Sequence, residues 1–474
     1  MTPIKGRVPT RIALFNGLGS VAYGVKDNGF STFLLIFYNQ VLGMDARLVS
    51  FALLIALVFD GMIDPVFGHL SDRTYTRWGR RLPWLYLAPI PLAIAWVFLW
   101  SPVGAPSFGY LLVTAICVRA AVGACEVPSS ALVAEITRDY DERTRILRYR
   151  YLFGWGGGLL MLLLAYGVFL PNSMLAREGY REFGIVGAVL MLGSVLVSAW
   201  GQHSTIAHYP AKVPAKTTLR ASANEILSCL TQPAFVIVLL AIVAQVTSTG
   251  ISFSISNYAY LYLWKFSAGA YRLYPFLLFG SVIASFFLAG PLHKRWGKRD
   301  VGVVTALVAL IFAIFPILLR WAGAWPVDGT AAATGLLFAF LFCSNAASVI
   351  SSISIWSMVA DVVELSEQQT GRREEGTFAA GAFFASKCST GLGIFITGFL
   401  LSFAGMPQGA KPGMVDPAVI DRLALSYAAA ISILGIAVAL ILRRFPITRA
   451  DHEARLAALD AAARADPDAG GMHP

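Results

Sequence analysis

The sequence predicts an all-α polytopic membrane protein with twelve transmembrane helices in two pseudo-symmetric halves of six. Hydrophobic residues make up 57% of the 474-residue chain and charged residues 14%, and the mean hydropathy is +0.66. A soluble fold of this composition would have too few polar side chains to cover its surface. The composition therefore excludes an ordinary soluble enzyme, a disordered protein and a disulfide-rich secreted domain.

Each predicted helix is an apolar segment of about 20 residues or more, the length that crosses roughly 30 Å of hydrocarbon. The first segment is too long for a cleavable signal peptide, and it contains Lys26 and Asp27. In chain order the twelve segments cover residues 12–38, 48–71, 82–101, 107–134, 149–170, 182–201, 232–262, 272–292, 301–320, 330–360, 376–405 and 424–443.

The distribution of basic residues predicts the orientation. The chain has 37 Lys and Arg and a net charge of +10. With the N-terminus inside, 26 of them fall in inside segments, 8 in outside segments and 3 within spans. Because basic residues are enriched in cytoplasmic loops, we expect both termini in the cytoplasm. The same bias explains the positive charge without nucleic acid as a partner.

Two similar loops indicate an internal duplication. After the second span the chain reads GHLSDRTYTRWGRR, and after the eighth it reads GPLHKRWGKRD. Similar loops at equivalent positions of the two halves are typical of a repeated six-helix unit. We therefore expect four parts: an N-terminal bundle over residues 1–201, a cytoplasmic central loop over 202–231, a C-terminal bundle over 232–444 and an Ala-rich cytoplasmic tail over 445–474.

A pair of acids in the second span is the first functional candidate, because charges inside a membrane are costly and mark functional sites. Asp60 and Asp64 are four residues apart in FDGMIDP, so both carboxylates lie on one helix face. Two adjacent carboxylates cannot both stay ionised in a dry site without a cation. A bound Na⁺ or a shared proton would resolve the conflict. The alternative is a pair of helix-end acids that form salt bridges with loop residues.

Three other spans carry charges. Lys26 and Asp27 lie in the first span, and Arg119 and Glu126 share one face of the fourth. Arg119 is interpreted as half of an internal salt bridge between helices. Lys387 is the only charge in its long apolar run, and we expect it to neutralise an acid of the other half. Such a pair could break and re-form as the halves rock.

The loop GHLSDRTYTRWGRR is interpreted as a cytoplasmic gate and packing element with little substrate contact. Asp361 and Glu364, at the inner end of the tenth span, are the expected counterpart charges from the second half. The gate and structural residues that we expect are Asp72, Arg73, Arg80, Arg81, Arg119 and Asp361.

The loop motif Gly-x-x-x-Asp-Arg-Thr followed by Arg-Trp-Gly-Arg-Arg-x-Pro carries a resemblance. It resembles the loop between spans 2 and 3 of the glycoside–pentoside–hexuronide:cation symporters, the melibiose permease-like family of the major facilitator superfamily. Four further matches extend from residue 24 to residue 387: Gly24-x-Lys26-Asp27, Asp60-x-x-x-Asp64-Pro65, Asp141-Glu142-Arg143-Thr144 before Tyr149-Arg150, and Met358-Val359-Ala360-Asp361 before Lys387.

The resemblance implies a twelve-helix alternating-access fold with cation binding at Asp60 and Asp64. It implies a substrate site made of Lys26, Asp27, Glu126, Arg150 and Lys387. The chain departs from the family pattern at four positions of this region: Leu57, Ile63, Glu126 and Ser130.

The coupling ion is expected to be H⁺ rather than Na⁺. Na⁺ needs several oxygen ligands, whereas apolar Ile63 stands beside the acid pair and Gly123 of the fourth span has no side chain to offer. A proton needs one carboxylate only. Backbone carbonyls or water could complete a Na⁺ shell, so Na⁺ at Asp60 and Asp64 stays open as the single metal candidate.

We therefore expect a secondary active transporter that moves a small polar solute, a sugar, glycoside or sugar acid, together with a cation. A lysolipid-like or other amphipathic substrate is the alternative. A membrane-embedded enzyme or sensor is disfavoured, because the spans show no metal-ligand or Ser/His/Asp set and no loop holds a soluble domain. We expect no cofactor and a monomer in the bacterial inner membrane, with substrate, cation and lipid bilayer as its partners.

Overall fold

The computed structural model describes residues 6–137, 139–171, 173–207, 229–370 and 375–446. In this part the regular structure is helical, and eleven helical segments are long and apolar enough to cross a membrane. The predicted all-α polytopic fold is confirmed. Most of the predicted central loop 202–231 and nearly all of the tail 445–474 lie outside the described residues.

The N-terminal half contains five of these eleven segments, and the short helical pieces of the first predicted span precede them. Its elements are α1 (Thr10–Leu18), α2 (Val21–Asn28), η1 (Gly29–Phe33), α3 (Leu34–Ile36), η2 (Phe37–Val41), α4 (Ala46–Asp72), α5 (Leu82–Leu87), α6 (Pro89–Trp100), α7 (Phe108–Ile136), α8 (Tyr140–Leu164), η3 (Ala165–Phe169) and α9 (Arg177–Ile206).

The C-terminal half contains the other six. Its elements are η4 (Cys229–Thr231), α11 (Pro233–Tyr258), η5 (Ala259–Leu263), α12 (Ala268–Trp296), α13 (Lys298–Trp321), α14 (Ala331–Thr370), α15 (Glu375–Ala404) and α16 (Pro417–Arg443).

The first predicted span is a series of five short helical pieces, α1, α2, η1, α3 and η2, from Thr10 to Val41. Glycines allow this series of helical pieces to pack closely against α8. A Cβ on Gly24 would lie 1.9 Å from the carbonyl oxygen of Gly154, and one on Gly157 would lie 2.7 Å from that of Val21. Small residues allow membrane helices to approach closely, and this contact has little room for larger side chains.

The fifth helix extends beyond its predicted span. Hydropathy places its start at residue 149, whereas α8 begins at Tyr140. The Asp139 side chain accepts hydrogen bonds from the backbone N–H groups of Asp141 and Glu142, which caps the helix. The added turns are polar, so α8 projects past its apolar part.

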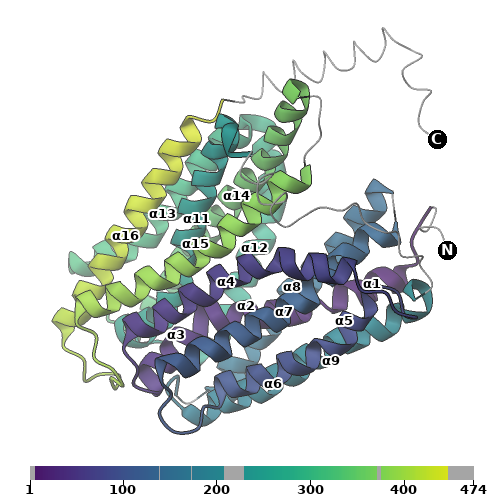
Figure 1. Ribbon diagram of the computed structural model, residues 1–474. Helices are drawn as coiled ribbons and strands as arrows, with labels where there is room; N and C mark the ends of the chain where they lie inside the picture. The colour runs from purple at the N-terminus through teal and green to yellow at the C-terminus, as the bar shows by residue number, and fades with distance from the viewer. Residues whose placement is uncertain (1–5, 138, 172, 208–228, 371–374, 447–474) are drawn as a thin grey trace.

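The two halves meet at one end of the molecule and spread apart toward the side where the termini lie (Figure 1). Helix α4 packs against α15, and α11 packs against η1. At the joined end, Asn257 donates to the carbonyl oxygen of Thr32 at 2.9 Å, and Tyr262 donates to the side chain of Gln40 at 3.1 Å. The charged side chains described next lie along the same seam.

Candidate substrate and cation site

A lysine of one half contacts both acids of the other. Asp60 and Asp64 are one turn apart on α4, and Lys387 comes from α15. The Lys387 Nζ lies 3.1 Å from Asp60 Oδ2 and also contacts Asp64 Oδ2. The ammonium thus bridges the acid pair, and the two acids are not paired with loop residues. The sequence interpretation of Lys387 as a partner of an N-half acid agrees with this geometry.

Asp60 has a second basic partner, Arg119 of α7. Arg119 Nη1 lies 3.5 Å from Asp60 Oδ2, and the two side chains are only 3% and 2% exposed. The guanidinium carbon lies 4.0 Å from the centre of the Phe30 ring, within range of a cation–π interaction. This is the internal salt bridge that we expect for Arg119, and it keeps the Asp60 carboxylate deep in the protein.

Lys26 and two further acids extend the cluster. The buried Lys26 Nζ lies 2.8 Å from Asp27 Oδ1 and 3.8 Å from Glu126 Oε2. The acids are much more accessible, because 63% of the Asp27 side chain and 35% of the Glu126 side chain are exposed. The Lys26 ammonium is therefore shielded from solvent, whereas the Asp27 and Glu126 carboxylates remain accessible to hydroxyl donors.

Arg150 lies apart from these acids, on α8. Its Nη1 donates to the Ser129 hydroxyl at 2.7 Å and to Asn16 Oδ1 at 3.3 Å, and its Nη2 donates to the Ser130 hydroxyl at 2.9 Å. The guanidinium is buried by these neutral groups. Sequence reasoning did not anticipate these partners, because single Ser and Asn residues give no distinctive pattern.

The charges of the cluster do not cancel. Asp27, Asp60, Asp64 and Glu126 supply four carboxylates, against the three cations Lys26, Arg119 and Lys387. With one carboxylate in excess the cluster carries a net negative charge, which favours the uptake of a monovalent cation.

Two buried atoms of the cluster, Asp64 Oδ1 and Arg119 Nε, have no hydrogen-bond partner among the described residues. Asp64 Oδ1 is buried without a hydrogen bond, although Lys387 contacts the other carboxylate oxygen. It faces Gly123 of α7, where a Cβ would lie 3.1 Å away. The second carboxylate oxygen of Asp64 is thus free to bind a proton or a cation.

The loop residues form a separate cluster within the N-terminal half. Glu135 of α7 accepts from Arg80 at 2.8 Å and from Arg81 at 3.0 Å, and Arg81 also contacts Asp72. These ion pairs join the ends of α4, α5 and α7. Arg73 ends α4 with an exposed side chain and lies outside this network.

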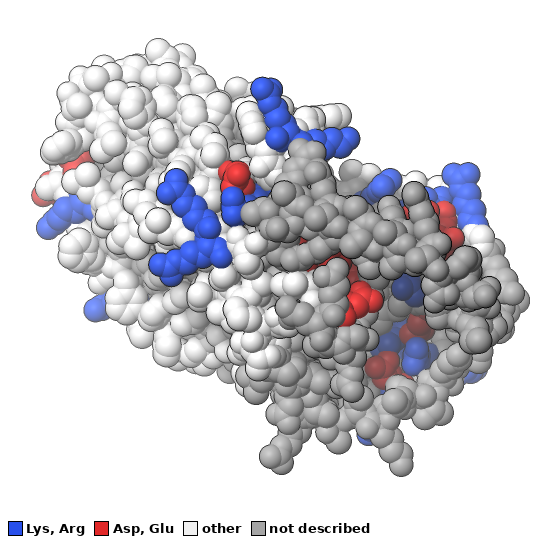
Figure 2. All heavy atoms as spheres, turned by 90° about the horizontal axis from the view of Figure 1, so that it is seen from above, with Lys and Arg blue, Asp and Glu red and all other residues white. Residues whose placement is uncertain are grey.

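The second half repeats this arrangement. Lys298, which belongs to the similar loop GPLHKRWGKRD of the second half, lies 2.5 Å from Asp361 of α14. Asp361 therefore pairs with the loop of its own half. In Figure 2 acidic and basic side chains lie together in a hollow of the molecule, beside residues drawn in grey.

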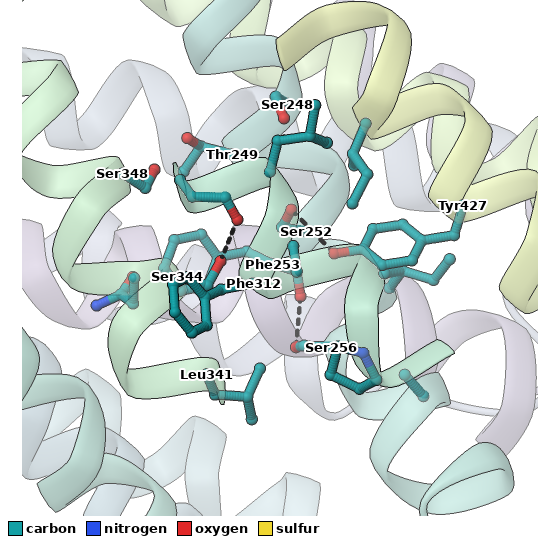
Figure 3. A pocket seen from close by; sticks show the side chains of 18 of the residues that line it. Ser248, Thr249, Ser252, Phe253, Ser256, Phe312, Leu341, Ser344, Ser348 and Tyr427 are labelled. Carbon is teal, nitrogen blue, oxygen red and sulfur yellow. Dashed lines mark hydrogen bonds between the residues drawn. The ribbon is translucent and has the colours of Figure 1, made fainter. Parts of the chain in front are cut away.

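Sequence reasoning also missed a cavity in the C-terminal half. It has a volume of about 170 Å³ and is lined by α11, η5, α12, α13, α14 and α16 (Figure 3). Hydroxyl groups on α11 recur there at four-residue intervals, at Ser248, Ser252 and Ser256. The four-residue spacing of these serines is the sequence pattern that could have indicated a polar helix face. Ser is nearly neutral in hydropathy, however, and does not stand out in an apolar run.

Comparisons with known proteins agree with this architecture. An uncharacterized symporter of Synechocystis sp. is 27% identical over 92% of this chain and 94% of its own length. The isoprimeverose transporter of Lactiplantibacillus pentosus is 24% identical over 85% of this chain and 82% of its own. The crystal structure of a D-xylose-proton symporter has a TM-score of 0.66 at 16% identity, covering 93% of this chain and 98% of that one, and so shows the same fold.

The family model described as MFS/sugar transport protein matches residues 15–449, nearly the whole chain. The matched proteins are transporters, so this integral membrane protein is a transporter and not an enzyme. The resemblance found in the loop and span motifs is thereby confirmed. The chain belongs to the MFS/sugar transport protein family and, within it, to the glycoside–pentoside–hexuronide:cation symporters.

Proposed function

We propose that the protein carries a small polar solute, a sugar, glycoside or sugar acid, together with one proton. Membership of the family supports cation-coupled sugar transport in general. The observation that carries the finer proposal is the Lys387 ammonium, which contacts Asp60 and Asp64 across the two halves.

This contact links ion binding to movement of the halves. Two unit charges about 4 Å apart attract by about 4 kcal/mol at an effective dielectric constant near 20. Shifting a two-state equilibrium from 1:99 to 99:1 takes about 5.5 kcal/mol. A proton that neutralises Asp64 removes much of the attraction to Lys387. Asp60 still contacts Lys387, but the loss of the Asp64 attraction is comparable in size to the energy that shifts the balance between two arrangements of the halves.

The choice of proton over Na⁺ rests on the surroundings of Asp64. Lys387 contacts one Asp64 carboxylate oxygen, and Gly123, which has no side chain to offer as a ligand, faces the other. Na⁺ would have to displace Lys387 and gather several oxygens, whereas a proton needs only the unpartnered Asp64 Oδ1. The net excess of one carboxylate is consistent with one monovalent ion per cycle.

The substrate groups are proposed at the accessible end of the cluster. Asp27 and Glu126 are exposed enough to accept hydrogen bonds from sugar hydroxyls, and Lys26 holds both acids in place. Because Arg150 is already bonded to Ser129, Ser130 and Asn16, it would donate to substrate only after a rearrangement. With both termini in the cytoplasm, the halves spread toward the inside, so we assign this structure to an inward-facing conformation.

Uptake into proteoliposomes tests the proposal. The purified protein is reconstituted and supplied with a panel of labelled neutral sugars, glycosides, sugar acids and lysolipids, under an imposed proton gradient or an imposed Na⁺ gradient. We expect a sugar-type compound to accumulate under the proton gradient and not under the Na⁺ gradient. Accumulation driven by Na⁺ in the presence of a proton ionophore would contradict the proton assignment. Accumulation of the lysolipids alone would contradict the substrate class.

A further inference from the structure

The cavity in the C-terminal half is lined by neutral polar groups on helices that the charged cluster does not use. The described residues of its lining include nine that bear a hydroxyl group: Ser248, Thr249, Ser252, Ser256, Tyr260, Tyr274, Ser344, Ser348 and Tyr427. Among the described residues that line it there is no Asp, Glu, Lys, Arg or His. A charged ligand would therefore lose its hydration without gaining a counter-charge, which excludes ions as the occupant.

The hydroxyl groups on α11 are not explained by the packing of α11 against α15 of the same half. Packing against α15 uses another face of α11, where a Cβ on Gly250 would lie 3.0 Å from the carbonyl oxygen of Thr390. Ser254 of that face lies 3.3 Å from the Thr397 hydroxyl. Ser248, Ser252 and Ser256 recur every four residues and point into the cavity instead (Figure 3).

These groups form a partial hydrogen-bond network with unused capacity. Gln245 Nε2 donates to Ser348 at 3.0 Å, and the hydroxyls of Ser252 and Tyr427 are 3.3 Å apart. Within the described part of the chain, neither the amide oxygen of Gln245 nor the hydroxyl of Ser248 has a hydrogen-bond partner. A hydroxyl that donates keeps two acceptor lone pairs. These free donor and acceptor sites offer several hydrogen bonds to a polar occupant.

The size and walls of the cavity define that occupant further. About 170 Å³ equals the share of some five or six water molecules at about 30 Å³ each. It is smaller than pockets for drug-sized ligands, which begin near 300 Å³. Phe253 and Phe312 supply apolar surface for the carbon skeleton of a ligand (Figure 3). These features fit a compact molecule that carries several hydroxyl groups on a short carbon chain.

We infer that this cavity is a second binding site, for a compact uncharged polyol. It is separate from the charged cluster, because Lys26, Asp27, Asp60, Asp64, Glu126 and Lys387 are absent from its lining. A polyol bound there contacts α11, α14 and α16 of one half only, and its binding does not depend on the proposed coupling reaction.

Equilibrium binding of labelled xylitol to the full chain in lipid nanodiscs tests the inference, with xylonate as the charged counterpart of similar size. Ser248→Leu fills part of the cavity, and Ser248→Ala removes only a hydroxyl group. Ser402→Leu is the matched control, because Ser402 is exposed on α15 and lies outside the cavity. Asp27→Asn reports on binding at the charged cluster.

We expect saturable xylitol binding, and at least tenfold weaker binding of xylonate. Ser248→Leu should weaken xylitol binding at least tenfold and Ser248→Ala about threefold or more, in keeping with the loss of one hydrogen bond. Ser402→Leu and Asp27→Asn should leave it unchanged. Absence of saturable xylitol binding would show that the cavity holds water only. Unchanged affinity in a folded Ser248→Ala protein, or loss of binding in Asp27→Asn, would also overturn the inference.

Discussion

Asp27 and Glu126 differ from the other acids of the cluster in being open to a ligand. Charge-assisted hydrogen bonds contribute about 1.5–3 kcal/mol each. Asp27→Asn and Glu126→Gln should therefore each weaken binding of the transported sugar by about tenfold or more, since a tenfold change in affinity is about 1.4 kcal/mol. The measurement is substrate affinity by equilibrium binding. Asp45→Asn, at the capped start of α4, is the control that should not change it. Unchanged affinity in both cluster variants would remove these acids from the substrate site.

Arg119 and Asp60 form the most deeply buried ion pair of the cluster. Removing one partner of a buried pair leaves a charge without compensation and costs about 3–5 kcal/mol. We expect Arg119→Leu to lower the free energy of unfolding by about 3 kcal/mol, the lower end of this range, because Lys387 still contacts Asp60. The free energy of unfolding of the purified protein measures this loss. The double variant Asp60→Asn with Arg119→Leu should recover much of it, and a loss that the double variant does not reduce would contradict the pairing.

Among single residues, the sequence identified the charges but not all of their partners. A lone charge in an apolar run, such as Lys387, requires an acid at the same depth, so its pairing could be anticipated. The neutral partners of Arg150 could not, because Ser129 and Asn16 resemble ordinary span residues until the helices are packed. The partner of Asp361, Lys298, could not be assigned either, since a loop of either half could have supplied the base.

The contact between α2 and α8 depends on glycine. A Cβ on Gly24 would overlap the carbonyl of Gly154, whereas nothing lies within 4 Å of a Cβ on Gly156. Overpacking costs about 1–3 kcal/mol, and occasionally more. Gly24→Ala should thus lower the melting temperature, and Gly156→Ala should leave it unchanged or raise it slightly because Ala favours helix. Equal melting temperatures for the two variants would mean that the two segments do not approach so closely.

Most helix positions were predictable to within a few residues, because the thickness of the membrane sets the apolar length, whereas α14 continues to Thr370 instead of residue 360 and α16 begins at Pro417 instead of residue 424. The exceptions have physical causes. Hydropathy cannot detect the polar first turns of α8, which Asp139 caps beyond the apolar part. It also cannot detect that the first span is divided into pieces from Thr10 to Val41, because the pieces share one apolar run. The cavity of the C-terminal half escaped detection for a similar reason, since it is formed by packing.

The orientation of the whole molecule rests on its basic loops and can be measured directly. In a background without native cysteines, Ala215→Cys in the central loop should resist membrane-impermeant thiol reagents in intact cells and react after lysis. Val103→Cys is the positive control, because Val103 is 94% exposed in a loop that this topology places outside. Strong labelling of residue 215 in intact cells would reverse the assigned orientation, and with it the inward-facing assignment.

The central claim is that protonation of Asp64 weakens its contact with Lys387 and thereby couples ion movement to substrate movement. Asp64→Asn removes the titrating group but keeps its shape. The most direct test compares two modes in the same proteoliposomes: concentrative uptake driven by a proton gradient, and counterflow exchange of labelled for unlabelled substrate without any gradient. The account predicts that Asp64→Asn abolishes concentrative uptake while counterflow and substrate binding remain measurable. Concentrative uptake that persists in Asp64→Asn at the level of the Asp45→Asn control would contradict it.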